Sequence, residues 1–330
     1  MTSSNARLIS FRSRHGGRSI DAACWYHYCM QVESLNKKQK YILAISGGVD
    51  SVVLLHKTMA HHSSEGGSNV SFIVAHFDHG MRPESADDAE FVRKLAESYG
   101  LEYAMERAEL GESASEEQAR NARYAFLSRV MVDNKAHGIV TAHHQDDVLE
   151  TMVSNILRGT SPRGLRGFTL RSIIRPLLHV PKSDIMAYAD THSLQWRQDS
   201  TNDDTTYTRN YIRKHVMPQL ENDRGALLSI RERIITNYTE IDDLISKLLV
   251  QTVKKGALVR AQFVAYPYVV QKELMATYLR IQGLEIDSSM VVRAVTAAQT
   301  MMPGKHIELS KGVSLHSLKH TVSLRSDKKQ

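Results

Sequence analysis

The chain has 330 residues, of which 42% are apolar and 24% charged, a composition that argues against disorder, collagen or a coiled coil. It holds no stretch of about 18 uncharged apolar residues, which excludes a membrane-spanning helix. Lys and Arg number 42 against 36 Asp and Glu, and the resulting net charge of +6 weakly favours a polyanionic partner. The two cysteines, Cys24 and Cys29, exclude a disulfide framework and indicate a reducing compartment.

The first twenty residues are rich in Arg and Ser and contain neither Asp nor Glu. This composition resembles an organelle transit peptide, and no apolar core of a secretory signal is present. We favour the simpler interpretation, a basic extension over residues 1–35 with a helix at about 21–35. The predicted location is the bacterial cytosol, with organelle targeting as the alternative.

From residue 40 onward, predicted strands alternate with predicted helices. Continuous apolar strands separated by helices indicate a parallel sheet covered on both faces, and therefore an α/β domain, which we place at 36–221. Ligands of such sheets bind at the carboxyl ends of the strands. The predicted strands are 41–45, 71–77, 101–107 and 138–142, and the helices are 52–60, 85–99, 115–135 and 144–157.

After residue 221 the pattern changes to long helical segments. They are predicted at 225–255, 269–282 and 288–300. Short apolar alternations follow at 307–309 and 322–324, and residues 305–330 carry six Lys or Arg against two acidic residues. We therefore predict a second, smaller and mostly helical domain over 222–330, with a short β element at its end.

The first predicted strand leads into the hexapeptide Ser46-Gly47-Gly48-Val49-Asp50-Ser51. Its glycines allow a tight turn and close approach of a ligand to the backbone. The following helix points free N–H groups at that ligand, and the serine hydroxyls can bind phosphate oxygens. Lysine is absent, unlike in the P-loop of NTPases. The strand–turn–helix context disfavours the alternative, a plain glycine turn in which Asp50 caps the helix.

Histidines and carboxylates follow the second and fourth predicted strands. His76 and His79 end the second strand, and a pair at this spacing is more often structural than metal-binding. After the fourth strand, Asp147 and Glu150 share one face of the first turn of a helix. They either complement the helix dipole or hold Mg²⁺ or a cationic substrate. A zinc site lacks the usual spacing of a third ligand.

Arginines gather in two regions. Arg120 and Arg123 lie three residues apart on a predicted helix, where they either present two guanidinium groups together or form a solvated basic face. Residues 151–183 contain six Lys or Arg and no acidic residue, and Arg163 and Arg166 each precede a glycine. A mobile basic loop of this kind suits a phosphate backbone, although a charge run is often only a solvated face.

Together these motifs resemble those of the tRNA(Ile)-lysidine synthetases, a family of PP-loop ATP pyrophosphatases. The resemblance covers about residues 36–221, and Thr201 departs from it because the family often has serine there. It implies a parallel-sheet PP-loop nucleotide-binding domain of the adenine nucleotide α-hydrolase-like kind, followed by a small tRNA-binding domain. The ordered blocks are SGGVDS at 46–51, HFDHGMR at 76–82, EQARNARY at 117–124, HHQDDVLET at 143–151, RPLL at 175–178, and a last block running from DSTN at 199–202 to RNYIR at 209–213.

The activity implied by the resemblance is a two-step ligation that uses ATP and Mg²⁺ as cofactors. The C2 oxygen of the wobble cytidine in a CAU-anticodon tRNA(Ile) attacks the α-phosphate of ATP and releases pyrophosphate. The ε-amine of free L-lysine then displaces AMP and leaves lysidine, which changes decoding from AUG to AUA. The partners are therefore tRNA and lysine, with no membrane, and a homodimer is left open.

The resemblance also implies roles for individual residues. Ser46, Gly47, Gly48, Val49, Asp50 and Ser51 hold ATP. Mg²⁺ arrives with ATP, and Asp50 or Asp147 is the candidate protein ligand. Catalysis and lysine binding fall to Asp146, Asp147 and Glu150, with His79 or His143 as candidate proton acceptor. Phosphate or tRNA contacts fall to Arg120, Arg123, Arg163, Arg166, Arg209 and Arg213.

Two other functions compete with this hypothesis. A PP-loop enzyme that thiolates tRNA typically needs cysteines within its core, and the chain has none after Cys29. A non-catalytic RNA-binding protein with a degenerate nucleotide fold would not need an intact phosphate loop, acids and arginines together. Both alternatives are disfavoured. An assay of ATP cleavage would distinguish an enzyme from the non-catalytic RNA-binding protein.

Overall fold

The computed structural model describes residues 35, 39–64, 70–80, 85–108, 115–168, 172–198 and 208–326. The predicted helix at 21–35, except Leu35, and the DSTN motif at 199–202 lie outside these residues. The chain divides into two compact units, Met1–Arg231 and Glu232–Gln330. In the part of the chain that is described, no helix is both long enough and apolar enough to cross a membrane.

The first unit is built on a five-stranded sheet in the order β3-β2-β1-β4-β5, and every pairing in it is parallel. This confirms the predicted α/β fold and its first four strands. The fifth strand was not predicted because two residues are too short to show a pattern. The strands are β1 (Lys40–Ala44), β2 (Ser71–Asp78), β3 (Glu102–Arg107), β4 (Gly138–Val140) and β5 (Ile173–Ile174).

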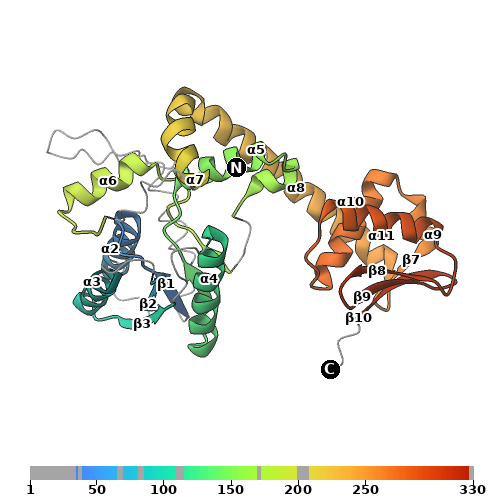
Figure 1. The fold of residues 1–330 in the computed structure, drawn as a ribbon, viewed down its shortest axis with the longest axis horizontal. Helices are drawn as coiled ribbons and strands as arrows, with labels where there is room; N and C mark the ends of the chain where they lie inside the picture. Colours follow the sequence, from blue (N-terminus) through green and yellow to red (C-terminus); the bar gives the residue numbers. More distant parts are fainter. Residues whose placement is uncertain are drawn as a thin grey trace, which may run out of the picture. The chain divides into compact units, whose positions relative to one another are not determined.

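Helices cover both faces of this sheet (Figure 1). Leu43 of β1 packs in a cluster with residues of α2, α3 and α6, whereas the next residue back, Ile42, packs with Phe126 and Leu127 of α4. Adjacent residues of a strand face opposite sides of the sheet. Because helices cover both faces here, the strands need apolar residues at consecutive positions. The helices are α2 (Val49–Ser64), α3 (Ser85–Ser98), α4 (Glu116–Asp133), α5 (Gln145–Leu157), α6 (Lys182–Thr191) and α7 (Thr208–Tyr211).

Short helical turns connect the later elements of this unit. A 3₁₀ helix spans Pro162–Arg166. After α7 the chain continues as a π-helix over Ile212–Val216 and a 3₁₀ helix over Met217–Asp223, and α8 (Arg224–Thr252) follows. The division between the two units falls within α8, about ten residues after the domain boundary expected from sequence.

The second unit pairs helices with an antiparallel sheet in the order β6-β7-β10-β9-β8. Its core joins Leu258, Leu315 and Val322 of the sheet to Leu274 and Val295 of the helices. The sheet is larger than the short β element predicted. The two strands within 253–259 are too short to show an alternation, and the alternating strand at 313–317 was missed. The elements are β6 (Val253–Lys254), β7 (Ala257–Val259), α9 (Arg260–Ala265), α10 (Tyr268–Ile281), α11 (Ser288–Thr300), β8 (His306–Ser310), β9 (Val313–Ser317) and β10 (Thr321–Ser326).

The core of the first unit makes a stability prediction. Leu54 of α2 is 0% exposed, so Leu54→Ala should lower the free energy of unfolding of this unit by about 2–5 kcal/mol, through lost apolar burial and the remaining cavity. Trp196 is a described residue of this unit and the second unit contains no tryptophan in its sequence, so urea unfolding followed by tryptophan fluorescence reports on the first unit. Val132→Ala, at a side chain 68% exposed, is the control and should change stability by less than about 0.5 kcal/mol.

Candidate functional site

The loop between β1 and α2 is held by its own hydroxyls. The Ser51 hydroxyl accepts a hydrogen bond from the Gly47 N–H (3.1 Å) and donates one to the Gly48 carbonyl (2.8 Å). The Gly48 N–H points to the Ser46 hydroxyl at 3.4 Å. Gly47 has φ +92°, which residues with a Cβ rarely adopt. The first turn of α2 follows the loop directly, and the N–H groups that begin an α-helix have no partner within the helix, an arrangement that suits phosphate.

Two other segments fix this loop in place. The Gly47 carbonyl accepts a hydrogen bond from the Arg197 backbone N–H (3.0 Å), which comes from the segment after α6. Just before the loop, the Ile45 carbonyl lies 2.9 Å from Nδ1 of the buried His76. His76, which the sequence suggested was structural, thus acts on the backbone that leads into the phosphate loop.

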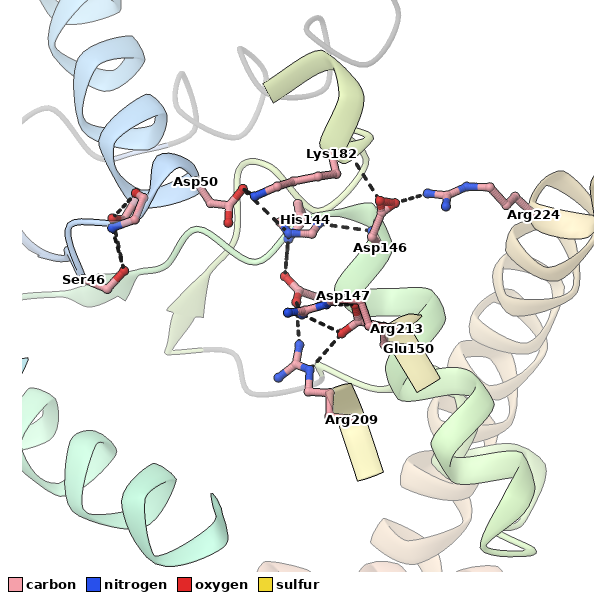
Figure 2. A network of polar contacts seen from close by, with 12 residues as sticks. Ser46, Asp50, His144, Asp146, Asp147, Glu150, Lys182, Arg209, Arg213 and Arg224 are labelled. Carbon is pink, nitrogen blue, oxygen red and sulfur yellow. Dashed lines mark hydrogen bonds and ion pairs between the residues drawn. The ribbon is translucent and has the colours of Figure 1, made fainter. Parts of the chain in front are cut away.

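Asp50, in the first turn of α2, joins the loop to α5 and α6 (Figure 2). Its carboxylate pairs with the Lys182 ammonium at 2.6 Å and lies 3.7 Å from Nε2 of His144. Lys182 is the first residue of α6, and His144 caps the N-terminus of α5. A cation absent from the loop itself therefore reaches it from a distant part of the sequence.

The N-terminus of α5 carries the two acids predicted to act together, and the structure brings both onto arginines (Figure 2). Asp147 pairs with Arg209 at 2.5 Å. Glu150, whose side chain is 2% exposed, pairs with Arg209 at 2.9 Å and with Arg213 at 2.6 Å. Arg213 also donates to the second Glu150 oxygen at 3.0 Å. Sequence reasoning did not anticipate that these four residues would form one charged cluster.

His144 positions Asp147 from the opposite side. The His144 backbone N–H donates to Asp147 Oδ2 at 2.9 Å, while its Nδ1 accepts from the Asp146 N–H at 3.2 Å. Burial would raise the pKa of Asp147, but the positive potential of His144 and Arg209 prevails and lowers it to about 2. Asp147 is therefore ionised at neutral pH and is suited to holding a cation rather than to accepting a proton.

His143 is kept neutral beside this cluster. Its Nδ1 lies 2.8 Å from the Thr141 hydroxyl, and its ring contacts Phe168. Burial lowers its pKa to about 3, with Arg123 and other arginines adding to that effect while Asp147 opposes it. Burial likewise lowers the pKa of Arg123 on α4, and the charges of Arg209 and Asp147 are close enough to contribute to the shift.

The remaining predicted residues lie in several places. Asp146 pairs with Arg224 at the start of α8. Arg120 and Arg123 of α4 both lie against the Tyr124 ring, at 5.1 and 5.5 Å from its centroid. Arg163 and Arg166 lie in the 3₁₀ helix Pro162–Arg166, and the Arg166 carbonyl accepts from Arg231 at 3.1 Å.

His79 packs its ring against Phe77 at 4.9 Å. Sequence reasoning also missed Lys182, Arg197 and Arg224 as contributors, since each acts through a contact distant along the chain. His144 could have been found, because a polar residue directly before a helix is a signal for an N-cap.

A magnesium ion carried by a nucleotide needs few protein ligands, since Mg²⁺ usually keeps waters and phosphate oxygens beside one or two carboxylates. Asp50 fits such a role because its carboxylate stands at the phosphate loop. Asp147 is the other candidate, and its carboxylate is already engaged by Arg209 in the same way that the carboxylate of Asp50 is engaged by Lys182. Among the described residues, no three His, Cys, Asp or Glu side chains are grouped to hold a metal by themselves.

The parallel sheet and the glycine loop after β1 define the class of protein. The family model described as the PP-loop domain matches residues 25–220. Among solved structures, the U34-tRNA thiolase NcsA from Methanococcus maripaludis, with its 4Fe-4S cluster, is similar with a TM-score of 0.54. That match covers 69% of this chain and 88% of the other at 17% identity, so it shows the fold alone.

Relatives by sequence identify the family more closely. A tRNA(Ile)-lysidine synthase from Chlorobaculum tepidum is 31% identical over 293 residues, which is 83% of this chain and 87% of the relative. Those from Thermus thermophilus and Deinococcus deserti are 40% and 38% identical over 57% and 54% of this chain. The chain belongs to the PP-loop domain family and, within it, to the tRNA(Ile)-lysidine synthases. It spans only 37% and 33% of the Thermus and Deinococcus relatives.

The backbone of the phosphate loop makes the first prediction from this site. Gly47→Ala should lower the free energy of unfolding by about 1–2 kcal/mol, because φ +92° is strained with a Cβ and that Cβ would lie 3.3 Å from Val92. Gly48→Ala is the matched control, since its Cβ would meet only the Ser46 hydroxyl at 3.6 Å. Urea unfolding followed by tryptophan fluorescence measures both, and equal losses would contradict the prediction.

The neutral His143 makes a second prediction, on pH. Its pKa is about 3 in the folded protein and 6.5 ordinarily, so below pH 6.5 only the unfolded chain takes up a proton. Acidification from pH 7 to 5 should therefore lower the free energy of unfolding of the wild type by about 1–2 kcal/mol through this residue. The His143→Gln variant should not show this loss. Urea unfolding at both pH values measures this. The exposed His137→Gln should keep the wild-type dependence, and a full loss in His143→Gln would contradict the prediction.

Proposed function

We propose that this protein ligates lysine to C2 of the wobble cytidine of a CAU-anticodon tRNA(Ile), forming a C–N bond at the expense of ATP. The observation that carries the proposal is the run of contacts from Asp50 in the phosphate loop, through His144, to Asp147. Arg209 then links Asp147 to Glu150. The run joins a phosphate site to an acidic site in one array. Membership of the tRNA(Ile)-lysidine synthase family supports the same reaction.

ATP binds with its phosphates at residues 46–51. Backbone N–H groups and the dipole of α2 stabilise the phosphate oxygens and the pyrophosphate that leaves. Magnesium would neutralise phosphate charge there, and Asp50 or Asp147 would be its protein ligand. The Lys182 ammonium, 2.6 Å from Asp50, adds positive charge at the same place. The cytosine C2 oxygen then forms a bond to the α-phosphorus while the bond to pyrophosphate breaks.

Lysine binds at the N-terminus of α5. Its ammonium groups need acids and its carboxylate needs a cation, and the cluster of Asp147, Glu150, Arg209 and Arg213 offers both charges. Asp147, with a pKa of about 2, holds an ammonium group at neutral pH. The ε-nitrogen bonds to C2, the bond from C2 to the adenylate oxygen breaks, and AMP leaves. The attacking amine gives up its proton to solvent water.

The RNA is held by basic side chains. Arg163 and Arg166, in an acid-free stretch of sequence, are suited to the phosphate backbone of the anticodon loop, and Arg120 and Arg123 to phosphate near the reacting base. The basic second unit, residues 222–330 in the sequence-based division, is proposed to bind the body of the tRNA. Thiolation is not favoured, since the likeness to a thiolase extends to fold alone and the chain has no cysteine after Cys29.

Lysine transfer tests the proposal directly. Labelled lysine should be incorporated into a CAU-anticodon tRNA(Ile) transcript with ATP and Mg²⁺, with release of AMP and pyrophosphate. Asp147→Asn and Glu150→Gln should each reduce incorporation by roughly 100-fold or more, because each removes a charge from the ammonium site and leaves arginines unpaired. Asp133→Asn, at an exposed carboxylate of α4, is the matched control and should retain wild-type activity.

The outcomes separate the parts of the proposal. Incorporation that persists on a transcript with U at the wobble position would contradict the assigned base. Release of AMP and pyrophosphate without incorporation would show that lysine is the wrong nucleophile. Failure to cleave ATP with any tRNA would contradict enzymatic function and favour a binding protein.

A further inference from the structure

Phe168 has an unusual backbone and stands beside the acidic cluster. It follows Gly167 at the end of the basic 3₁₀ segment and has φ +40°, an outlier for a bulky residue. Such conformations persist only where the surroundings hold them, and they concentrate at functional sites. The residues that hold Phe168 therefore indicate what its ring is used for.

Arg175 is the residue that holds Phe168. It directly follows β5 and is only 5% exposed. One guanidinium nitrogen donates to the Phe168 carbonyl at 3.2 Å and to the Ile173 carbonyl at 3.1 Å. The guanidinium also lies over the Phe168 ring, 5.0 Å from its centroid. Backbone and ring of Phe168 are thus fixed by one buried cation.

Further flat groups surround this pair. The neutral His143 ring lies 5.1 Å from the Phe168 ring, tilted by 54°. Burial lowers the pKa of Arg175, and Tyr124 of α4 is close enough to raise it in opposition. Aromatic rings and guanidinium planes are the groups on which proteins stack unpaired RNA bases. Here they come from α4 and from the carboxyl ends of β4 and β5.

We propose that Phe168, backed by Arg175 and flanked by His143, is the stacking platform for the target base once that base has left the anticodon stack. The inference rests on the proposed function, in which a pyrimidine must lie within reach of both ATP and lysine. His143 immediately precedes the residue that caps α5, and its charge environment includes Asp147, Arg123 and Arg209. A base stacked on Phe168 would therefore lie beside the proposed lysine site.

The adenine of ATP is the other planar ring in this reaction. Because the adenine is joined to the triphosphate, its position is limited by the phosphate loop that follows β1. The platform lies instead at the ends of β4 and β5, on the side of β1 away from β2 and β3. It also adjoins the segment that contains Arg163 and Arg166, which suits RNA. These positions favour the RNA base as the occupant.

A fluorescent cytidine analogue tests the platform. An anticodon stem–loop carrying pyrrolocytosine at the wobble position is titrated with the full-length protein, and binding should quench its fluorescence by stacking. Phe168→Leu should abolish most of the quenching and weaken binding by roughly 5- to 100-fold, since the ring that stacks the base is gone. Phe168→Tyr should restore both. ATP affinity is measured separately as a control for folding, and it should be unchanged in both variants.

Two controls make the result specific. Val132→Leu, an exposed change on α4, should behave as the wild type. Pyrrolocytosine placed elsewhere in the anticodon loop should give the same signal with wild type and Phe168→Leu. Photocrosslinking of wild-type protein to an RNA with 5-iodocytidine at the wobble position requires no variant, and the crosslinked peptide should contain Phe168.

The inference is overturned if Phe168→Leu quenches like the wild type, if the crosslink forms on another segment, or if Phe168→Leu loses ATP affinity while quenching persists. Wild-type protein that shows no quenching overturns it as well. The assay of lysine incorporation distinguishes failure of the platform hypothesis from failure of the proposed function. Undiminished incorporation by Phe168→Leu rejects the platform alone, whereas wobble-base stacking with no incorporation by the wild type rejects the function alone.

Discussion

The constraint on which the site depends is the burial of two carboxylates at one helix N-terminus. Asp147 and Glu150 are almost fully enclosed, and an isolated buried charge is costly enough that cations must accompany it. Arg209 and Arg213 supply those cations from the segment around α7, and His144 supplies a backbone donor. The acids therefore determine the position of elements that lie more than fifty residues further along the chain.

The parallel sheet explains why these charges meet the phosphate loop. Parallel strands end at a common edge, so residues after β1 and β4 become neighbours although nearly one hundred residues separate them. His144 lies between Asp50 and Asp147 at 3.7 and 3.6 Å, which makes it the direct bridge between the two sites. Lys182 closes the array from α6 and brings to the loop the positive charge that its own sequence lacks.

Several residues were predictable and others were not, for physical reasons. Asp147 and Glu150 share a helix face because their spacing matches the helical period, and the glycine loop follows a strand that its apolar run identifies. Arg209 and Arg213 were expected against phosphate or tRNA, but no local pattern shows that they meet the acids. The backbone angle of Phe168 and its contact with Arg175 were not visible either, since both arise only on folding.

The sequence by itself determined the α/β class, the strands of the first unit that are long enough to show a pattern, the phosphate loop and the family. Each depends on residues close together in the chain, whose spacing follows the period of a helix or strand. Tertiary structure decided which charges pair, which histidine bridges, and how large the second sheet is. Pairing energies depend on distance and burial in space, and neither quantity is encoded by separation along the chain.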